Sequence, residues 1–301
     1  MKTAVVFPGQ GAQYVGMGRS LCEGSRAARE IFLAAGRILG DGFLQTCFSG
    51  PDGVLAETSI CQPALFVHGC AAVSALLEKF PEEKYAVAYG LSLGELTALW
   101  AAGVFDFETG LKVVAERGRL MEKACLKTDG AMLCLIGGTP DAVGEVCCSA
   151  SVEPANVNCP GQIVVSGETK NIEKAMSIAE KMPFRRALRL NVSGAYHSKL
   201  MESASVGFEK FLRNVDFQVP RIEVLTNVTG MAVSLPDEIR AMLCRQIVSP
   251  VLFEKCCRTA MESGVGKFFE CGPGRTLSGM LRKIDDSVSV RNFDRIEDFD
   301  A

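Results

Sequence analysis

Short apolar runs alternate with helical patterns of apolar and polar residues along most of the chain. Thr3 to Phe7 and Tyr85 to Tyr89 are apolar runs of strand length, and Leu111 to Ala124 has the period of an amphipathic helix. Gln62 to Lys79 is apolar almost throughout, which predicts a buried helix. Strands that alternate with helices are typical of α/β domains with a largely parallel sheet. We therefore expect an α/β fold for the main part of the chain.

The middle of the chain shows a different pattern. Residues 127–195 predict the order strand, helix, two strands, helix, strand, which is that of a ferredoxin-like subdomain. The predicted elements are Ala131 to Ile136, Pro140 to Cys148, Ala155 to Asn158, Gln162 to Gly167, Lys170 to Lys181 and Arg186 to Leu190. We expect residues 127–195 to be a small subdomain inserted into a larger domain made of residues 1–126 and 196–301.

Five further elements are predicted after residue 195, where the inserted subdomain ends. They are a helix from Lys199 to Asn214, a strand from Glu223 to Thr226, a helix from Pro250 to Glu262, a strand from Phe268 to Glu270 and a helix from Thr276. The tail from Asp285 onward is rich in charge, and we expect it to be peripheral.

Composition narrows the class of protein. A net charge of −3 on 301 residues gives no basic field that would attract nucleic acid or an anionic membrane. No apolar run approaches the length that spans a bilayer, and the N-terminus lacks a signal-peptide pattern. The 13 cysteines include no C-x-x-C pair, so we expect most of them to be buried thiols in a reducing compartment. We therefore expect the protein in the cytoplasm. We expect no metal site, because the chain has only two histidines and no spacing links them to cysteines as metal ligands.

The segment Gly90-Leu91-Ser92-Leu93-Gly94 is the strongest candidate for chemistry. It stands between a predicted strand and a predicted helix, the setting in which G-x-S-x-G exposes a nucleophilic serine on a sharp turn. The N–H groups that open the helix would point at a developing oxyanion. The alternative is an ordinary strand-to-helix turn with a serine N-cap.

A serine nucleophile needs a base, and the chain offers only His68 and His197. His68 lies within the apolar helical run, so we expect a hydrogen-bonded core histidine. His197 stands in a predicted loop downstream of Ser92, the position of the base in hydrolase-like folds. No acidic residue stands out as a third member, and a backbone carbonyl could orient the ring instead.

Arg117 is a further candidate, with two interpretations. On its helix it could be solvated or paired with a neighbour such as Glu122. In a cleft it would instead bind a carboxylate through two parallel N–H bonds.

Eight short motifs then follow one another in order between about residues 3 and 285. They are Phe7-Pro8-Gly9-Gln10-Gly11-Ala12-Gln13 with Gly16-Met17-Gly18, Gln62-Pro63-Ala64, Gly90-x-Ser92-Leu93-Gly94-Glu95, Arg117-Gly118 before Met121, Gly130-Ala131-Met132, Asn158-x-Pro160-Gly161-Gln162, His197-Ser198-x-Leu200-Met201 and Gly272-Pro273-Gly274. In order and spacing the chain resembles the malonyl-CoA:acyl-carrier-protein transacylases of fatty-acid synthesis and the acyltransferase domains of polyketide synthases.

The resemblance implies a ping-pong acyl transfer from malonyl-CoA to acyl carrier protein. Ser92 would attack the thioester while His197 takes its proton, and the N–H groups of Gln10 and Leu93 would hold the oxyanion. Coenzyme A would leave a malonyl ester, which the phosphopantetheine thiol of the carrier then attacks. Arg117 would bind the free malonyl carboxylate, which disfavours acetyl groups because the buried cation would then stay unpaired.

The resemblance also implies an α/β-hydrolase-like large domain with a ferredoxin-like small one. A main-chain carbonyl near Ser249-Pro250 would orient the base, and Tyr196 and Met132 would contact the acyl group. The coenzyme A thioester is a substrate, so no cofactor is expected, and we expect a monomer.

Two positions depart from the family pattern. Leu91 stands where the family usually has histidine, so packing would have to support the turn. Tyr196 stands where malonyl-selective members often have phenylalanine, so its hydroxyl needs a partner.

Other functions remain open on the sequence alone. One is a polyketide-associated acyltransferase or a proofreading acyl hydrolase, which would not need Arg117. Another is a catalytically silent scaffold that binds the carrier protein. For the acidic carrier, the basic residues Lys199, Arg275 and Arg282 are candidates for contact.

Overall fold

The larger part of the molecule is built on a six-stranded sheet. The computed structural model describes residues 1–300. The strand order is β10-β9-β1-β2-β7-β8, and all neighbours pair in parallel except β8, which is antiparallel to β7. The strands are β1 Lys2–Phe7, β2 Val87–Gly90, β7 Glu223–Leu225, β8 Ala232–Val233, β9 Val265–Cys271 and β10 Ser289–Phe293. The prediction of an α/β fold with a largely parallel sheet is confirmed.

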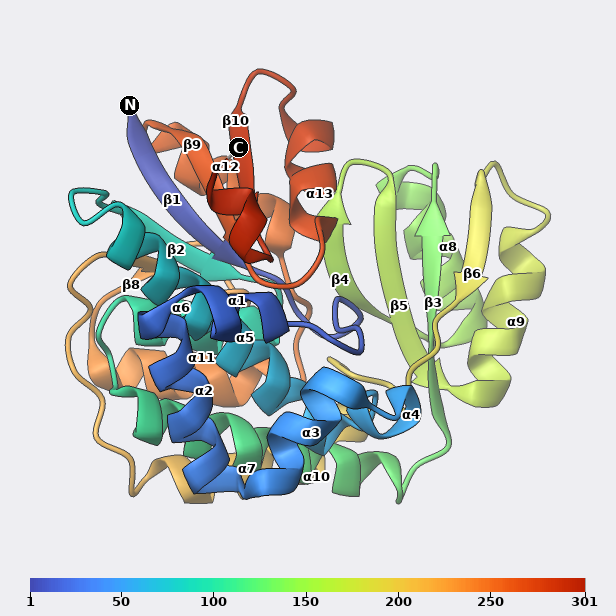
Figure 1. Cartoon of the computed structure of the whole chain (residues 1–301). Helices are drawn as coiled ribbons and strands as arrows, with labels where there is room; N and C mark the ends of the chain where they lie inside the picture. Colours follow the sequence, from blue (N-terminus) through green and yellow to red (C-terminus); the bar gives the residue numbers. More distant parts are fainter. Residues whose placement is uncertain (301) are drawn as a thin grey trace.

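Helices cover both faces of this sheet (Figure 1). They are α1 Arg19–Gly24, α2 Arg26–Leu39, α3 Asp41–Ser49, α4 Asp52–Leu55, α5 Thr58–Lys79, α6 Leu93–Ala101, α7 Phe107–Cys125, α10 Glu202–Leu212, α11 Pro236–Gln246, α12 Phe253–Glu262 and α13 Thr276–Ile284, with 3-10 turns η1 Lys199–Met201 and η2 Ile296–Phe299. In β1, Val5 and Phe7 face one core while Ala4 and Val6 face the other. Two buried faces explain why this strand is apolar at successive positions.

The central helix α5 corrects one expectation from the sequence. By length and composition α5 could span a membrane, although no apolar run was expected to be long enough. However, 83% of its apolar window lies inside the protein, where α5 packs mainly against α7, α2 and α6. It begins at Thr58, four residues before the predicted start, and keeps Pro63 in its interior. We therefore describe α5 as the core helix of the larger part.

The smaller part has its own four-stranded antiparallel sheet with two helices on one face. Its elements are β3 Gly130–Ile136, α8 Pro140–Ala150, β4 Glu153–Cys159, β5 Gln162–Glu168, α9 Thr169–Ala179 and β6 Arg186–Arg189, and the strand order is β4-β5-β3-β6. Alternate residues of β3 face opposite sides, because Leu133 packs with α8 and α9 while Met132 packs with the main core. This is the predicted ferredoxin-like order. The exact limits of the subdomain, residues 127–195, stay a prediction.

The charged tail is part of the fold, so the expectation that it is peripheral was wrong. β10 is the edge strand of the main sheet and pairs in parallel with β9. Phe293 and Phe299 are buried, with ring centroids 4.9 Å apart, and Phe293 also contacts Phe269. These two aromatic side chains anchor a segment whose other residues are mostly polar.

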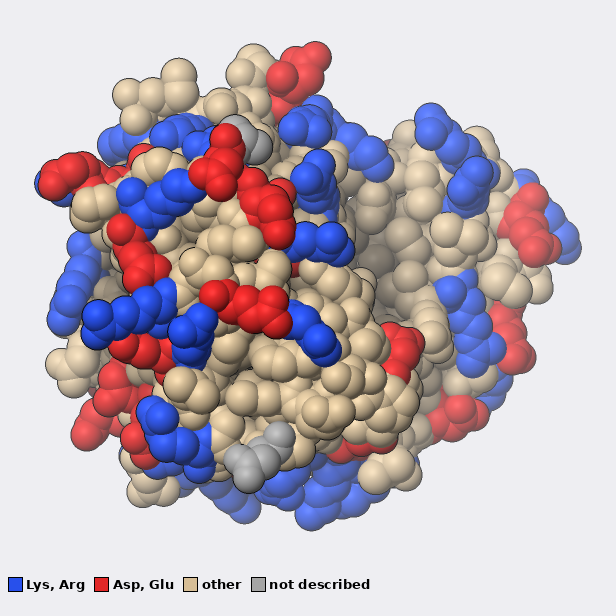
Figure 2. Space-filling model, in the orientation of Figure 1, with Lys and Arg blue, Asp and Glu red and all other residues tan. Residues whose placement is uncertain are grey.

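A hollow separates the smaller part from the larger one on the face shown in Figure 2. It is lined by residues from the loop after β1, from the start of α6, from β3, β4 and β5, and from α13. We call this hollow the cleft.

Candidate active site

Ser92 lies at the turn between β2 and α6, as the sequence predicts. Its backbone has φ 54° and ψ −102°, a left-handed conformation that non-glycine residues rarely adopt. The flanking glycines allow the turn to pack tightly. A Cβ at Gly94 would lie 2.1 Å from the carbonyl oxygen of Phe7, and one at Gly90 would lie 2.3 Å from the carbonyl carbon of Gly94. The turn is therefore a strained strand-to-helix turn, called the elbow below, of the kind that exposes a serine hydroxyl, rather than an ordinary serine N-cap.

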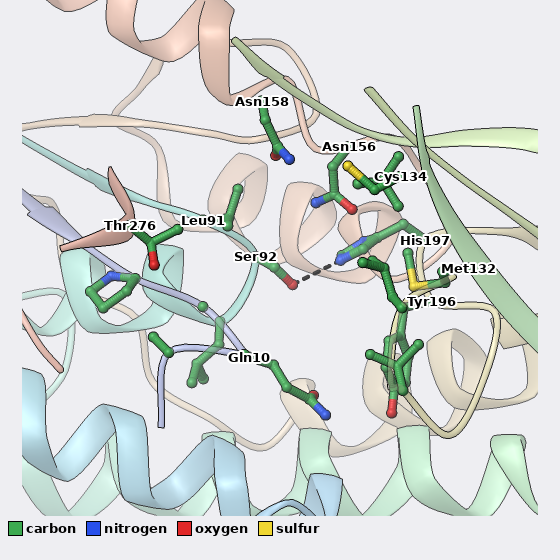
Figure 3. A pocket seen from close by; sticks show the side chains of 18 of the residues that line it. Gln10, Leu91, Ser92, Met132, Cys134, Asn156, Asn158, Tyr196, His197 and Thr276 are labelled. Carbon is green, nitrogen blue, oxygen red and sulfur yellow. Dashed lines mark hydrogen bonds between the residues drawn. The ribbon is translucent and has the colours of Figure 1, made fainter. Parts of the chain in front are cut away.

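His197 contacts the hydroxyl of Ser92. The Nε2 atom of His197 lies 2.8 Å from Oγ of Ser92 (Figure 3). On the other side of the ring, Nδ1 donates to the carbonyl oxygen of Gln246 at 2.8 Å. A proton on Nδ1 leaves Nε2 free to accept the proton of the serine. The orienting carbonyl thus belongs to Gln246, three residues before the expected Ser249-Pro250 pair, and the backbone of Ser249 also acts on the ring.

The surroundings keep His197 neutral. Burial lowers its pKa to about 4, and the positive charge of Arg117 acts in the same direction. The carbonyl of Gln246 opposes both effects because it stabilises the protonated ring. At neutral pH the imidazole is therefore unprotonated and in contact with the hydroxyl of Ser92.

Arg117 is buried beside Ser92 and is not paired with Glu122. Its Nη1 atom donates to Oε1 of Gln62 at 2.6 Å. Its Nη2 atom donates to Oε1 of Gln246 at 2.8 Å and to Oγ of Ser92 at 3.1 Å. Within residues 1–300, no carboxylate oxygen lies within ion-pair distance of this guanidinium, and its Nε has no hydrogen-bond partner. The cleft thus presents a buried cation at the hydroxyl of Ser92.

Two side-chain amides that the sequence did not single out support the elbow. Asn227, which follows β7, accepts from the N–H of Ser92 at 2.8 Å and donates to the carbonyl of Gly90 at 2.7 Å. Gln246, the last residue of α11, donates to the carbonyl of Ser92 at 3.0 Å. Their Nδ2 and Nε2 groups hold the turn that Leu91, without a polar side chain, cannot support by hydrogen bonding.

Glu95 is the third residue whose role the sequence did not reveal, although it ends the elbow motif. Its Oε2 atom accepts from the N–H of Asn227 and from Nε2 of Gln246, both at 2.8 Å. The side chain is 1% exposed, and burial raises its pKa to about 7. A buried carboxylate therefore lies behind the amides that contact Ser92 and Arg117.

The remaining predicted site residues all line the cleft. Gln10 follows β1, and Leu93 opens α6, where the first N–H groups have no partner within the helix. Met132 of β3 and Tyr196 lie on the side of the smaller part (Figure 3). The hydroxyl of Tyr196 is satisfied by Oγ1 of Thr58 at 2.5 Å and by Oγ of Ser193 at 2.8 Å. Tyr196, which stands where malonyl-selective members of the family often have phenylalanine, thus has the polar partners that its hydroxyl needs.

Basic side chains gather near the cleft over α13 (Figure 2). Arg282 and Lys283 are exposed on this helix, and Nζ of Lys283 contacts Oε1 of Gln162 on β5 at 3.4 Å. Arg275 and Lys199 are also exposed, and each lies close to one acid, Asp298 and Glu153 respectively. In the described part of the chain, no group of three or more His, Cys, Asp or Glu side chains is arranged to hold a metal ion.

Comparisons with known proteins agree with this geometry. Residues 4–292 match the family model of the acyl transferase domain. The malonyl CoA-acyl carrier protein transacylase of Staphylococcus aureus (strain MW2) is 37% identical over 302 residues, which is 99% of this chain and 97% of that protein. The crystal structure of an acyl carrier protein S-malonyltransferase from Vibrio cholerae O1 biovar eltor matches with a TM-score of 0.95 at 35% identity, over 100% of this chain and 99% of the other.

A third similar protein was solved with a partner. It is a malonyl-transacylase in complex with a type II PKS acyl-carrier protein, with a TM-score of 0.95 and 32% identity over 99% of this chain and 98% of that one.

Proposed function

The chain belongs to the acyl transferase domain family as a malonyl-CoA:acyl-carrier-protein transacylase, and from this premise we propose that it works through a malonyl ester of Ser92. The substrates are malonyl-CoA and acyl carrier protein, which the names of its relatives give for those proteins. The observation that carries the proposal is the hydroxyl of Ser92, which contacts the neutral base His197 and the cation Arg117 together.

In the first half-reaction, Ser92 attacks the thioester carbonyl of malonyl-CoA. Nε2 of His197 takes the hydroxyl proton as the new C–O bond forms. The oxyanion is held by the N–H groups of Gln10 and Leu93, the second of which also benefits from the N-terminus of α6. When the intermediate collapses, the C–S bond breaks and His197 returns the proton to the sulfur of coenzyme A.

In the second half-reaction, the phosphopantetheine thiol of the carrier protein attacks the ester. His197 takes the thiol proton and then gives it to Oγ of Ser92 as the serine leaves. The carbonyl of Gln246 stabilises the imidazolium in both directions. The reaction needs no metal or redox cofactor because each step only moves an acyl group and a proton.

Arg117 supports selection of a dicarboxylic acyl group. Its present partners, Gln62, Gln246 and Ser92, are all neutral, so a malonyl carboxylate would be its first direct counter-charge. An acetyl group would leave the buried cation without one. This feature favours malonyl transfer over the alternative of a proofreading acyl hydrolase, which has no use for a buried cation.

We propose that the malonyl group supplies chain extension in fatty-acid synthesis. The test is the intact mass of the protein after exposure to malonyl-CoA, which should rise by one malonyl group and fall back when carrier protein with its phosphopantetheine arm is added. Ser92→Ala should show no adduct. Folded wild-type protein that gains no mass would contradict the ester mechanism. Carrier that is bound but never acylated would support the scaffold alternative.

A further inference from the structure

Arg117 is a buried cation whose direct partners carry no charge. Its two terminal nitrogens donate to the side-chain oxygens of Gln62 and Gln246 and to the hydroxyl of Ser92. The residue is only 1% exposed. A buried charge without a counter-charge is strongly destabilising. Some other feature must therefore help to keep this guanidinium charged.

Glu95 is the acid that acts electrostatically on Arg117, and an amide separates the two. The side-chain oxygen of Gln246 accepts from Arg117 at 2.8 Å, while its nitrogen donates to Oε2 of Glu95 at 2.8 Å. Each charge shifts the pKa of the other group in the direction that favours the charged pair. Gln246 thus connects a buried cation to a buried carboxylate without direct contact between them.

The separation matters for a site that binds carboxylates. A protein carboxylate bonded directly to Arg117 would occupy the N–H groups that a substrate carboxylate needs. With the acid one amide away, the guanidinium keeps only neutral acceptors, which form weaker bonds to a cation than a carboxylate does. The arrangement keeps Arg117 charged and available.

We propose that Glu95 is a positioning residue that acts through Gln246 on Arg117, and that its charge sets how strongly the site prefers an acyl group with a free carboxylate. This proposal rests on the malonyl transfer proposed above. The ionised Glu95 repels an incoming carboxylate, whereas the protonated Glu95 does not. The preference for malonyl over acetyl should therefore rise as the pH falls and Glu95 becomes neutral.

The titratable groups around Glu95 and Arg117 change their charge outside the pH range in which Glu95 changes its own. Burial raises the pKa of Glu95 to about 7. Burial lowers the pKa of Arg117 on α7 to about 10 and that of His197 to about 4. Burial raises the pKa of Cys256 on α12, which also feels the charge of Glu95, well above its usual value. Tyr196, which faces Arg117, has its pKa raised to about 12 by burial.

The experiment compares the rate constants for acylation of Ser92 by malonyl-CoA and by acetyl-CoA between pH 8 and pH 6. Their ratio cancels every titration that affects both substrates, including that of the coenzyme A phosphate and that of His197. In the wild-type protein the ratio should rise about three- to tenfold from pH 8 to pH 6, the size expected for one unit charge about 8–10 Å away at an effective dielectric constant of about 30–40. A ratio that stays constant would overturn the proposal without any variant.

Glu95→Gln removes the charge and keeps an oxygen that can accept from Asn227 and Gln246. In this variant the ratio of the malonyl-CoA to the acetyl-CoA rate constant should be high already at pH 8 and independent of pH. The matched control is Glu270→Gln, which changes another buried glutamate that accepts from the N–H groups of Leu277 and Ser278. The control should keep the wild-type pH dependence.

Two further outcomes have defined meanings. A Glu95→Gln protein that keeps the wild-type slope, or a Glu270→Gln protein that loses it, would show that the slope does not come from Glu95. Wild-type protein that forms no malonyl adduct at any pH would instead refute the proposed function itself.

Discussion

The two histidines of the chain lie in clusters that differ first in whether a carboxylate contacts the ring. Nε2 of His68 lies 3.2 Å from Oδ1 of Asp294. The hydroxyl of Tyr14 donates to both oxygens of the same carboxylate, at 3.0 and 3.1 Å, and Nε of Arg295 donates to that hydroxyl at 3.3 Å. Around His197 there is also an arginine and a tyrosine, but among residues 1–300 no acid contacts the ring.

The His68 cluster, made of Tyr14, His68, Asp294 and Arg295, is complete without a ligand. Burial would raise the pKa of Asp294, but His68, the N–H of Gly274 and the hydroxyl of Tyr14 together bring it below its usual value. The cluster joins α5, the loop after β1 and the segment after β10. Its contacts indicate a role in holding these segments together.

The His197 cluster, made of Ser92, Arg117, Tyr196 and His197, has a cation, and no carboxylate of the described residues 1–300 forms an ion pair with it. All four residues line the cleft. Where His68 contacts Asp294 through Nε2, His197 contacts the hydroxyl of Ser92, and Arg117 is the group proposed to bind a substrate carboxylate. The comparison teaches that a histidine–carboxylate pair is not by itself a mark of catalysis. Access to the cleft and an unmatched charge distinguish the two clusters.

The largest expected effect separates the two histidines directly. His197→Ala should lower the rate of Ser92 acylation by malonyl-CoA at least about 10³-fold, because the hydroxyl then has no base. The measurement is the single-turnover increase in intact mass, with a thermal melt to confirm that the variant folds. A loss of less than tenfold would mean that some other group takes the proton.

The second-largest expected effect tests the positive charge of Arg117, which has no carboxylate partner among the described residues of the cleft. Arg117→Ala should lower malonyl acylation about 100-fold, since a charge-assisted hydrogen bond to the carboxylate is lost. Acetyl acylation should fall less than about tenfold. The two rates are measured on the same preparation by intact mass. Equal losses would count against Arg117 as the carboxylate-binding residue.

The sequence predicted that Ser92 and His197 would meet, and the structure places the two side chains in contact. G-x-S-x-G between a strand and a helix is a recognisable turn, and only two histidines were available as a base. The resemblance then assigned Gln10, Leu93, Arg117, Met132 and Tyr196, all of which line the cleft. Their individual roles stay predictions.

The sequence could not reveal Asn227 and Gln246, because neutral amides follow no pattern and act only after distant segments meet. Asn227 bonds to Ser92 across 135 positions, and Gln246 across 154. Glu95 resembled an acid in the first turn of a helix, a position where exposed acids are common. The prediction for the tail failed for a related reason. Its many charged residues indicate an exposed segment, but the burial of Phe293 and Phe299 fixes it to the main sheet. In each case tertiary contact, not local pattern, decides burial.

A third effect concerns stability rather than rate. His68→Leu removes the ring that faces Asp294 and leaves that carboxylate with fewer partners in a largely buried place. The free energy of unfolding should fall by about 1–3 kcal/mol, as measured by urea denaturation. Malonyl acylation should stay within about threefold of the wild-type rate. A loss of acylation as large as that of His197→Ala would erase the distinction between the two clusters.

The smallest effect is an absence of pH dependence where an ordinary histidine would show one. Because burial and Arg117 lower the pKa of His197 to about 4, the base stays neutral at pH 5. At saturating acetyl-CoA, which has no carboxylate for Glu95 to repel, the acylation rate should change less than about twofold between pH 7 and pH 5. A tenfold loss centred near pH 6.5 would show that the ring is far more exposed to solvent than the cleft geometry implies.

The same shift has the opposite consequence for stability. The pKa of His197 in the folded protein lies below its unfolded value of about 6.5, so the unfolded chain binds more protons between these two values. The contribution of His197 to stability is therefore present above pH 6.5 and is lost as the pH falls toward 4. His197→Gln, which carries no titrating ring, should lose less unfolding free energy than the wild type over this range in parallel urea titrations. Identical losses would mean that the folded ring takes up its proton as readily as the unfolded one, which would remove the basis for a neutral base at the elbow.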